Sequence, residues 1–195
     1  MMTTATTMAA AAPPVRPLIP RAVLFGDPDH LAPQVSPDGR HVSYLAPLGG
    51  ALNLFVAPVD APARARPVTR VTAAGMGGYT GEHYWAAAGE SILYPLDDRG
   101  NERWNVYRVD VATGETVNLT PTPDVLAFVE AVGHNHPGEV LVRLNDHDPK
   151  SYDLHRVDVR TGRRRLVLQN PGTIDGGGVY GFTADEDYAV RFATP

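Results

Sequence analysis

The 195-residue sequence contains no cysteine. Disulfide bonds, thiol nucleophiles and cysteine-ligated zinc are therefore excluded, although this absence leaves the cellular compartment open. Positive charge is also scarce, because 17 lysines and arginines stand against 22 acidic residues, for a formal net charge of −5. Nucleic-acid binders need concentrated positive charge to displace phosphate counterions, so the sequence argues against that function. The tight basic run Arg163-Arg164-Arg165 falls where a turn should meet a strand, and we interpret it as solvated charge at a sheet edge.

Long apolar runs are missing as well. None approaches the roughly 18 residues that a membrane-spanning helix requires, so no membrane association is predicted. The first twenty residues carry only a short alanine run, Ala9 to Ala12, which has no lysine or arginine ahead of it and is followed at once by Pro13-Pro14. This stretch lacks the apolar core of a secretory signal. We therefore expect a cytoplasmic protein with a disordered leader over residues 1–18.

What the sequence does contain is a repeat. The heptapeptide Arg-Val-Asp-Val-Ala-Thr-Gly at 108–114 returns as Arg-Val-Asp-Val-Arg-Thr-Gly at 156–162, which is 48 positions later. A second series of apolar triplets keeps nearly the same step, and its members begin at Val42, Ile92, Val140 and Tyr188. Two series that share one step indicate a repeated structural unit.

Each repeated unit has the pattern of short antiparallel strands. Val109 and Val111 alternate with polar residues at a period of two, which predicts strands, whereas helical repeats need a period near 3.6. Turn sequences such as Ser36-Pro37-Asp38-Gly39 and Thr113-Gly114 separate the strands. Four short strands in every unit of about 48 residues fit the blade of a β-propeller. The predicted fold class is all-β, a partial β-propeller of about three and a half four-stranded antiparallel blades.

The expected propeller covers residues 19–195, with blades at about 31–72, 80–120 and 126–169 and a partial blade at 177–195. Strands are expected at 33–35, 40–46, 52–59, 67–72, 84–85, 91–96, 104–111, 115–120, 139–144 and 188–192, and a short helical turn at 21–31. Such a count of blades cannot close a ring. Since open sheet edges attract other strands, we expect the chain to be part of a larger propeller or to close with another copy.

A series of motifs runs in a fixed order along residues 19–195. They are Ile19-Pro20, Leu24-Phe25-Gly26-Asp27-Pro28, Pro33-Gln34-Val35-Ser36-Pro37-Asp38-Gly39-Arg40, Tyr44-Leu45-Ala46-Pro47, Leu54-Phe55-Val56, Tyr94-Pro95-Leu96-Asp97-Asp98-Arg99-Gly100-Asn101-Glu102 and the two Val-Asp-Val-x-Thr-Gly hairpins. A single Ser-Pro-Asp-Gly turn is common in propellers, but the ordered set resembles the start of bacterial prolyl oligopeptidase family serine peptidases, the acylaminoacyl-peptidase-like members in particular.

The resemblance implies an N-terminal propeller that caps a C-terminal α/β-hydrolase domain and restricts entry to short peptides. In that family the hydrolase domain carries a Ser, Asp, His triad. Its nucleophile needs a Gly-x-Ser-x-Gly elbow, and none of Ser36, Ser43, Ser91 and Ser151 stands in one. No catalytic residue is therefore carried over. The adjacent glutamates with which dipeptidyl-peptidase relatives hold a substrate amino terminus are also absent from the sequence.

We accordingly predict a noncatalytic propeller part, inactive alone, that gates access of short peptides to a hydrolase domain missing from this sequence. The alternative is a stand-alone propeller module that binds protein or peptide and closes by self-association. Neither hypothesis involves a cofactor.

The densest group of candidate ligands is His134, His136, Asp146, His147 and Asp148. Imidazole and carboxylate groups could bind a divalent metal. However, these residues flank the predicted strand 139–144, whose six residues would separate the two loops by about 20 Å. We therefore predict solvated turn residues and no metal site.

Two loops are further candidates for binding. The polar loop 97–104 ends in an exposed-looking Trp104 and could contact a peptide or a neighbouring domain, but the simpler interpretation is internal pairing of Asp98 or Glu102 with Arg99 or Arg103. The glycine-rich stretch 75–81 lacks the flanking strand and helix of a phosphate-binding loop. We interpret it, and Gly176 to Gly178, as connections between blades, with Tyr84 and Trp85 filling the gap between sheets.

Overall fold

Three four-stranded antiparallel sheets make up most of the computed structural model, which describes residues 18–25, 29–72, 76, 81–174, 177–178 and 181–194. Within each sheet the strands are neighbours in chain order. The first sheet consists of β1 (Leu31–Val35), β2 (His41–Leu48), β3 (Ala51–Pro58) and β4 (Arg66–Pro67). The second consists of β5 (Tyr84–Trp85), β6 (Ser91–Leu96), β7 (Asn105–Asp110) and β8 (Thr116–Asn118). The third consists of β9 (Ala127–Ala131), β10 (Glu139–Asp148), β11 (Ser151–Asp158) and β12 (Arg164–Leu168).

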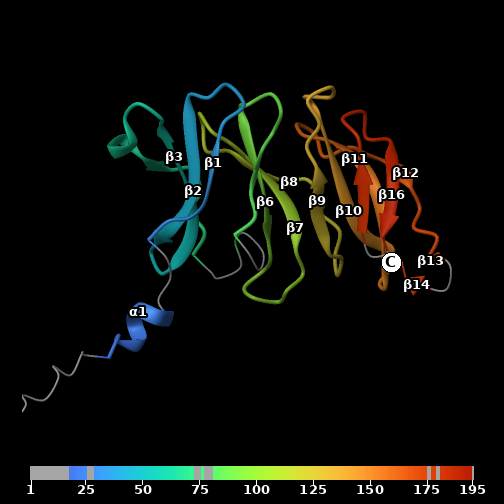
Figure 1. Cartoon of the computed structure of the whole chain (residues 1–195), viewed down its shortest axis with the longest axis horizontal. Helices are drawn as coiled ribbons and strands as arrows, with labels where there is room; N and C mark the ends of the chain where they lie inside the picture. The colour runs from blue at the N-terminus through green and yellow to red at the C-terminus, as the bar shows by residue number, and fades with distance from the viewer. Residues whose placement is uncertain are drawn as a thin grey trace, which may run out of the picture.

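Two smaller sheets follow along the chain. One joins β13 (Thr173–Ile174) to β14 (Gly177–Gly178), and the other joins β15 (Gly181–Ala184) to β16 (Val190–Thr194). Figure 1 shows the three large sheets side by side, in the order of the chain. The predicted fold class is confirmed, since the described chain is a partial β-propeller with three complete blades and the first hairpin of a fourth.

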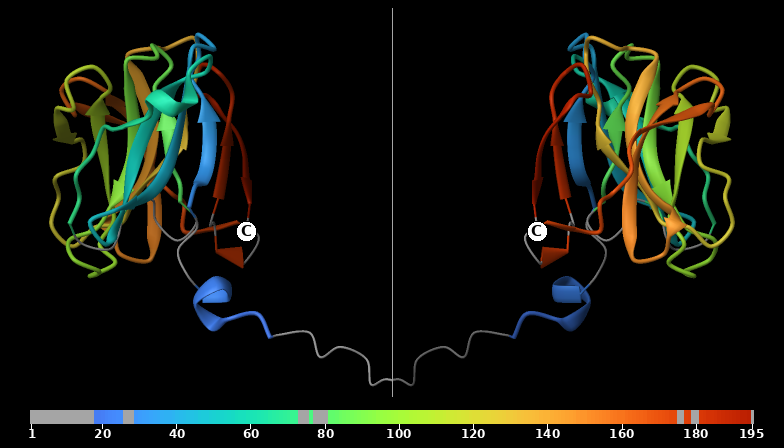
Figure 2. Two further views of the ribbon diagram at one scale, coloured as in Figure 1. Left: turned by 90° about the vertical axis from the view of Figure 1, so that its left-hand side faces the viewer. Right: turned by 90° about the vertical axis from the view of Figure 1, so that its right-hand side faces the viewer.

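Helix is nearly absent from the described residues. It is confined to α1 (Arg21–Phe25) and a 3-10 turn, η1 (Pro62–Arg64). Both views in Figure 2 place α1 below the sheets and away from them. The helical turn expected at 21–31 is shorter than predicted. It ends at Phe25, and Leu31 already belongs to β1, where it pairs with Leu45 of β2. No described helix has the length and apolar character needed to cross a bilayer.

Alternating side chains of the middle strands fill two different seams between sheets. In β6, Ile92 and Tyr94 pack with Leu45 and Leu54 of the first sheet. The intervening Leu93 packs on the opposite side, in the cluster that includes Val140, Val142 and Val157 of the third sheet. In β10 the alternation repeats, since Leu141 packs with Phe182 and Tyr188 of the last hairpin. Successive side chains of a strand point to opposite faces, so a blade covered on both sides needs apolar residues at odd and even positions alike.

The repeated heptapeptide forms the outer hairpin of the second and third blades. The carboxylate of Asp110 accepts hydrogen bonds from the backbone N–H and the hydroxyl of Thr113, both at 2.8 Å. Asp158 accepts the same pair from Thr161, both at 2.7 Å. Such bonds let the side chain close the turn in place of the backbone. The role of the repeated motif is therefore structural, because its side chains close the hairpin turn.

Several predicted strand bounds are wrong. The strands expected at 33–35, 115–120 and 188–192 are Leu31–Val35, Thr116–Asn118 and Val190–Thr194. Two others differ in length. The strand expected at 67–72 ends at Pro67. Beyond it the backbone N–H of Leu54 donates to the hydroxyl of Thr69 (2.9 Å), which takes the place of a backbone carbonyl of the neighbouring strand. The strand expected at 139–144 continues to Asp148, where Asp148 pairs with Ser151 across the β10–β11 turn.

A polar contact recurs where the third strand of each blade begins. It joins an Asn or Asp side chain to the second residue after the fourth strand. The pairs are Asn53 with the hydroxyl of Thr69 (3.0 Å), Asn105 with the hydroxyl of Thr120 (3.2 Å) and Asp153 with the backbone N–H of Asn170 (2.8 Å). All six residues are buried or half-buried, so these bonds satisfy polar groups that would otherwise be costly inside the sheets.

We expect Gly162→Ala to destabilise the fold more than Gly114→Ala. Both glycines have a positive φ, 72° and 76°, which costs an L-residue about 1–2 kcal/mol. At Gly162 an added Cβ would also lie 3.2 Å from the carbonyl oxygen of Leu119, whereas at Gly114 the nearest atom, the Val68 oxygen, is at 3.6 Å. Urea unfolding of the two variants measures the difference. Equal losses would contradict tight packing of the third-blade turn against the second blade.

Candidate functional site

The candidate metal ligands lie at opposite ends of one strand. His134 and His136 belong to the turn that precedes β10, whereas Asp146, His147 and Asp148 belong to its last residues. The ten-residue β10 is longer than predicted, and at about 3.3 Å per residue it holds the two groups apart. Among the described residues, no three His, Cys, Asp or Glu side chains are arranged to hold a metal ion.

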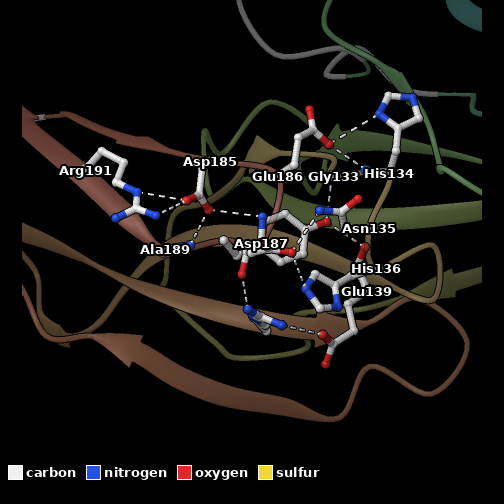
Figure 3. Close-up of polar contacts among 12 residues, drawn as sticks. Gly133, His134, Asn135, His136, Glu139, Asp185, Glu186, Asp187, Ala189 and Arg191 are labelled. Atoms are coloured by element: carbon white, nitrogen blue, oxygen red, sulfur yellow. Dashed lines mark hydrogen bonds and ion pairs between the residues drawn. The ribbon is translucent and has the colours of Figure 1, made fainter.

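The turn 133–136 makes polar contacts with the turn of the last hairpin (Figure 3). The carboxylate of Glu186 accepts a hydrogen bond from the backbone N–H of His134 at 2.7 Å and lies 3.4 Å from its Nδ1. Asp187 accepts a hydrogen bond from the Asn135 amide at 2.9 Å, and its carboxylate lies 3.6 Å from Nε2 of His136. These side chains therefore join the third blade to the fourth.

Tyr188 lies at the centre of this seam and is 1% exposed. Its hydroxyl accepts a hydrogen bond from the backbone N–H of Gly133 (2.8 Å) and donates one to the carbonyl of Glu139 (2.9 Å). The ring stacks on His136 with 5.5 Å between centroids, and the guanidinium of Arg156 lies 5.0 Å from its centroid. Burial raises the pKa of the Tyr188 hydroxyl, so it remains a hydrogen-bond donor at neutral pH.

The carboxylates of Asp185 and Glu186 in the last hairpin are well paired. Asp185 accepts hydrogen bonds from the backbone N–H of Asp187 (3.0 Å) and of Ala189 (2.9 Å), and it pairs with Arg191 at 2.5 Å. The bond from Ala189 and the contact with Arg191 lower the pKa of Asp185. The hydrogen bonds from His134 likewise lower the pKa of Glu186. This surface is thus a structural joint in which each of these groups already has a partner.

A buried Ser–His contact links the first blade to the second. Ser43 Oγ lies 2.9 Å from Nε2 of His83, and both residues are 0% exposed. Nδ1 of His83 faces the carbonyl of Gly81 at 3.3 Å, where a catalytic histidine would need a carboxylate. Burial lowers the pKa of His83 and keeps the imidazole neutral. Because no substrate can reach Ser43, this contact is structural.

The loop 97–104 is ordered by its own side chains. The Asp97 carboxylate accepts a hydrogen bond from the backbone N–H of Glu102 (2.9 Å), and Asn101 accepts one from the N–H of Arg103 (2.9 Å). The expected pairing within the loop is limited to exposed Asp98 and Arg99 at 3.7 Å, a contact worth little in water. The prediction that Trp104 is exposed is wrong, since the residue is buried and only 4% exposed.

A pocket of about 350 Å³ lies between this loop and the third blade. It is lined by Asn101, Glu102, Arg103, Trp104, Leu126, Phe128 and Tyr152. Below it, the guanidinium of Arg143 lies 5.2 Å from the Phe128 ring centroid and 5.4 Å from that of Tyr152. An aromatic floor with a polar rim, at a size near the lower limit for ligand pockets, can hold one side chain of a peptide. The 97–104 loop, which the residue pattern singles out, therefore borders a candidate binding pocket.

The remaining sequence candidates are structural where they are described. Arg164 pairs with Asp146 at 2.7 Å and Arg165 lies 3.8 Å from Glu139, so two of the three arginines at 163–165 have acidic partners on the sheet. Trp85 is buried between the first two sheets, as expected. Most of the stretch 75–81 lies outside the described residues, and Gly176 does too, whereas Gly177 and Gly178 form β14.

Comparison with known proteins relates this geometry to peptidases. The chain is 39% identical over 176 residues to dipeptidyl aminopeptidase BIII of Pseudoxanthomonas mexicana, which covers 90% of this chain and 24% of that protein. The chain thus spans about a quarter of the length of this curated relative. No family model matches the chain.

Solved structures show the same fold at low sequence identity. Dipeptidyl peptidase 4 of Porphyromonas gingivalis has a TM-score of 0.60 and 14% identity, with 87% of this chain and 33% of that chain covered. The β-propeller domain of the Trilobed protease of Pyrococcus furiosus has a TM-score of 0.52 and 11% identity, with 72% and 43% covered. The resemblance to the N-terminal propeller portion of a prolyl-oligopeptidase-family serine peptidase is confirmed.

We expect Tyr188→Phe to lower the free energy of unfolding by about 1–3 kcal/mol, because it leaves the buried N–H of Gly133 and the Glu139 carbonyl each short of a partner. Tyr107→Phe is the matched control, since its ring also stacks on a neighbour but its hydroxyl has no hydrogen bond in the described structure. Chemical denaturation of both variants measures the difference. Equal effects would refute the role of the Tyr188 hydroxyl.

We expect Glu186→Gln to lower the unfolding temperature at pH 7, with a difference that shrinks as the pH falls below about 4. The pKa of Glu186 is lower in the folded chain than its ordinary value. Its contribution is therefore present above the unfolded value and is lost as the pH falls through the folded value. Thermal unfolding between neutral and acidic pH measures this, with the exposed Glu102→Gln as control. A difference in unfolding temperature that does not change with pH would contradict a stabilising role of the ionised Glu186 carboxylate.

Proposed function

We propose that this chain is the noncatalytic propeller part of a prolyl-oligopeptidase-like serine peptidase and that it restricts the access of short peptides to a hydrolase domain. The observation that carries the proposal is the 39% identity to a dipeptidyl aminopeptidase along 90% of this chain, which corresponds to only 24% of that enzyme. The sequence contains no Gly-x-Ser-x-Gly elbow. Its one described Ser–His contact is buried.

The pocket beside loop 97–104 supports a contact with peptide. This loop follows β6 and precedes β7, so it lies at the opposite end of the blade from the 111–115 hairpin turn. Loops held at one end of a rigid set of sheets commonly carry binding residues. Trp104, Phe128 and Tyr152 supply apolar surface there, and Asn101 and Arg103 supply polar groups at the rim. A cytoplasmic location stays a prediction.

We expect the purified chain to show no turnover of chromogenic dipeptide substrates, because its sequence contains no Gly-x-Ser-x-Gly elbow. The assay is release of the chromophore over hours, with dipeptidyl aminopeptidase BIII as the positive control. Turnover that a serine-directed inhibitor abolishes would refute the noncatalytic assignment.

Gating is tested in a chimera in which residues 29–194 replace the matching quarter of dipeptidyl aminopeptidase BIII. We expect the chimera to hydrolyse short chromogenic peptides and to exclude an unfolded protein of the same terminal sequence. Tyr152→Ala in the pocket should raise KM with little change in kcat, because it removes binding surface without touching the nucleophile. Tyr107→Ala is the control, since Tyr107 does not line the pocket. Hydrolysis of long and short substrates at equal rates would refute gating.

A second function, a module closed by self-association, is favoured by exposed apolar residues on the outermost sheets. Val35 and Val59 of the first blade are 63% and 49% exposed, and Phe192 of β16 is 69% exposed. In the described chain β16 pairs only with β15, so one of its edges is open. Size-exclusion chromatography with light scattering distinguishes the two functions. A discrete dimer supports the module, and a monomer or disordered aggregate supports the peptidase part.

A further inference from the structure

Two arginines occupy the same position of the repeated hairpin but have different surroundings. Arg156, in the third blade, donates a hydrogen bond to Glu139 at 3.2 Å and another to the backbone carbonyl of Asp187 in the next blade. Arg108, in the second blade, has only an ion pair with Glu115 at 3.7 Å, which exceeds hydrogen-bond length. Its side chain is nevertheless only 11% exposed, and its Nε, like that of Arg156, has no hydrogen-bond partner in the described structure. The two arginines therefore differ in the acceptors of their terminal nitrogens.

The glutamate that accepts a hydrogen bond from Arg156 has no counterpart beside Arg108, where the equivalent residue is Ser91. A cleft of about 570 Å³ lies between the second and third blades. Ser91 lines it at the register position that Glu139 holds in the next blade, since Ser91 pairs with Asp110 as Glu139 pairs with Asp158. A short hydroxyl side chain there leaves room that the longer glutamate fills at the next seam. The cleft is thus an interblade site that lacks its inner acceptor.

A backbone carbonyl is the acceptor that arginines take at the other seams. Arg156 donates to the Asp187 carbonyl between the third and fourth blades, and Arg66 donates to the Val111 carbonyl between the first and second. At the second seam the described residues provide no such bond to Arg108. A backbone carbonyl of a bound peptide would give Arg108 the kind of acceptor that Arg156 and Arg66 have at the other two seams.

The charge of the cleft selects the side chains of that peptide. Its lining includes the carboxylates of Glu90, Asp110, Glu115 and Asp158, against two arginines, Arg108 and Arg160. Asp110 and Asp158 are bonded to their turns, and those hydrogen bonds lower the pKa of both, which keeps them ionised at neutral pH. A surplus of negative charge repels a free anion and attracts a cation. The occupant therefore combines a neutral carbonyl acceptor with a positive side chain.

We propose that this cleft binds an extended basic segment of a partner protein. A backbone carbonyl of the segment accepts hydrogen bonds from Arg108, and a lysine or arginine side chain pairs with Glu90 and Glu115 at the rim. Ala86 and Val117 supply apolar wall for the stem of that side chain. The cleft adjoins the hairpin turn 111–115, at the opposite end of the blade from loop 97–104, so this proposal does not depend on the peptidase assignment.

The test is isothermal titration of the full chain with two blocked pentapeptides, Ala-Lys-Ala-Lys-Ala and Ala-Glu-Ala-Glu-Ala. The lysine peptide is expected to bind, with an affinity that falls as salt is added, and the glutamate peptide is expected not to bind. Equal binding of the two peptides, or no binding of the lysine peptide up to about 10 mM, overturns the proposal.

Variants locate the binding. Arg108→Gln is expected to weaken the lysine peptide about tenfold or more, because it removes the buried guanidinium donor. Glu90→Gln, an exposed rim substitution that leaves the core intact, is expected to weaken it about threefold. Asp29→Asn makes the same change of charge at an exposed residue that lines neither this cleft nor the pocket beside loop 97–104, and it is expected to have no effect. If Arg108→Gln fails to fold, the comparison of Glu90→Gln with Asp29→Asn remains, and equal affinities of these two variants overturn the proposal.

Discussion

A four-stranded sheet with apolar residues on both faces must be covered on both sides, and the rest of this structure follows from that requirement. In β6 the side chains of Ile92 and Leu93 belong to different hydrophobic clusters, one shared with the first blade and one with the third. Burial of apolar area on this scale is the dominant stabilising term in folding. Each blade therefore depends on its neighbours, and apolar side chains such as Val35 and Phe192 remain exposed on the outermost of the described sheets.

Polar contacts at the seams add specificity to this packing, and each seam has its own. Ser43 and His83 join the first two blades through a fully buried bond. At the third seam the Tyr188 hydroxyl bonds backbone groups of the preceding blade. Glu186 accepts a hydrogen bond from the backbone N–H of His134, and Asp187 accepts one from the Asn135 side chain. The middle seam has a longer contact, from Arg164 to the hydroxyl of Thr122 at 3.4 Å, and a cleft around Arg108. Since an unpaired buried polar group is costly, a seam left open in this way differs in kind from its neighbours.

Most of the blade architecture could be predicted from the sequence because its causes are local. The alternation of Val109 and Val111 indicates a strand, and Asp, Thr and Gly at fixed positions of the hairpin define the turn. The burial of Trp104 and the contact of Tyr188 with Gly133 could not be predicted, since they join residues from different loops. The recurring pairs such as Asn53 with Thr69 could have been predicted, because the polar residues that form them recur along the sequence at nearly the same step as the hairpins.

The repeat also explains why the candidate sites lie where the blades differ. Residues at equivalent positions, such as Arg108 and Arg156, have the same backbone geometry, so any difference in function must come from the side chains around them. Ser91 in place of Glu139 opens a cleft, and the long loop 97–104 in place of a tight turn opens a pocket. Binding surface in this fold therefore arises where one repeat lacks a side chain, or carries extra residues, relative to the next.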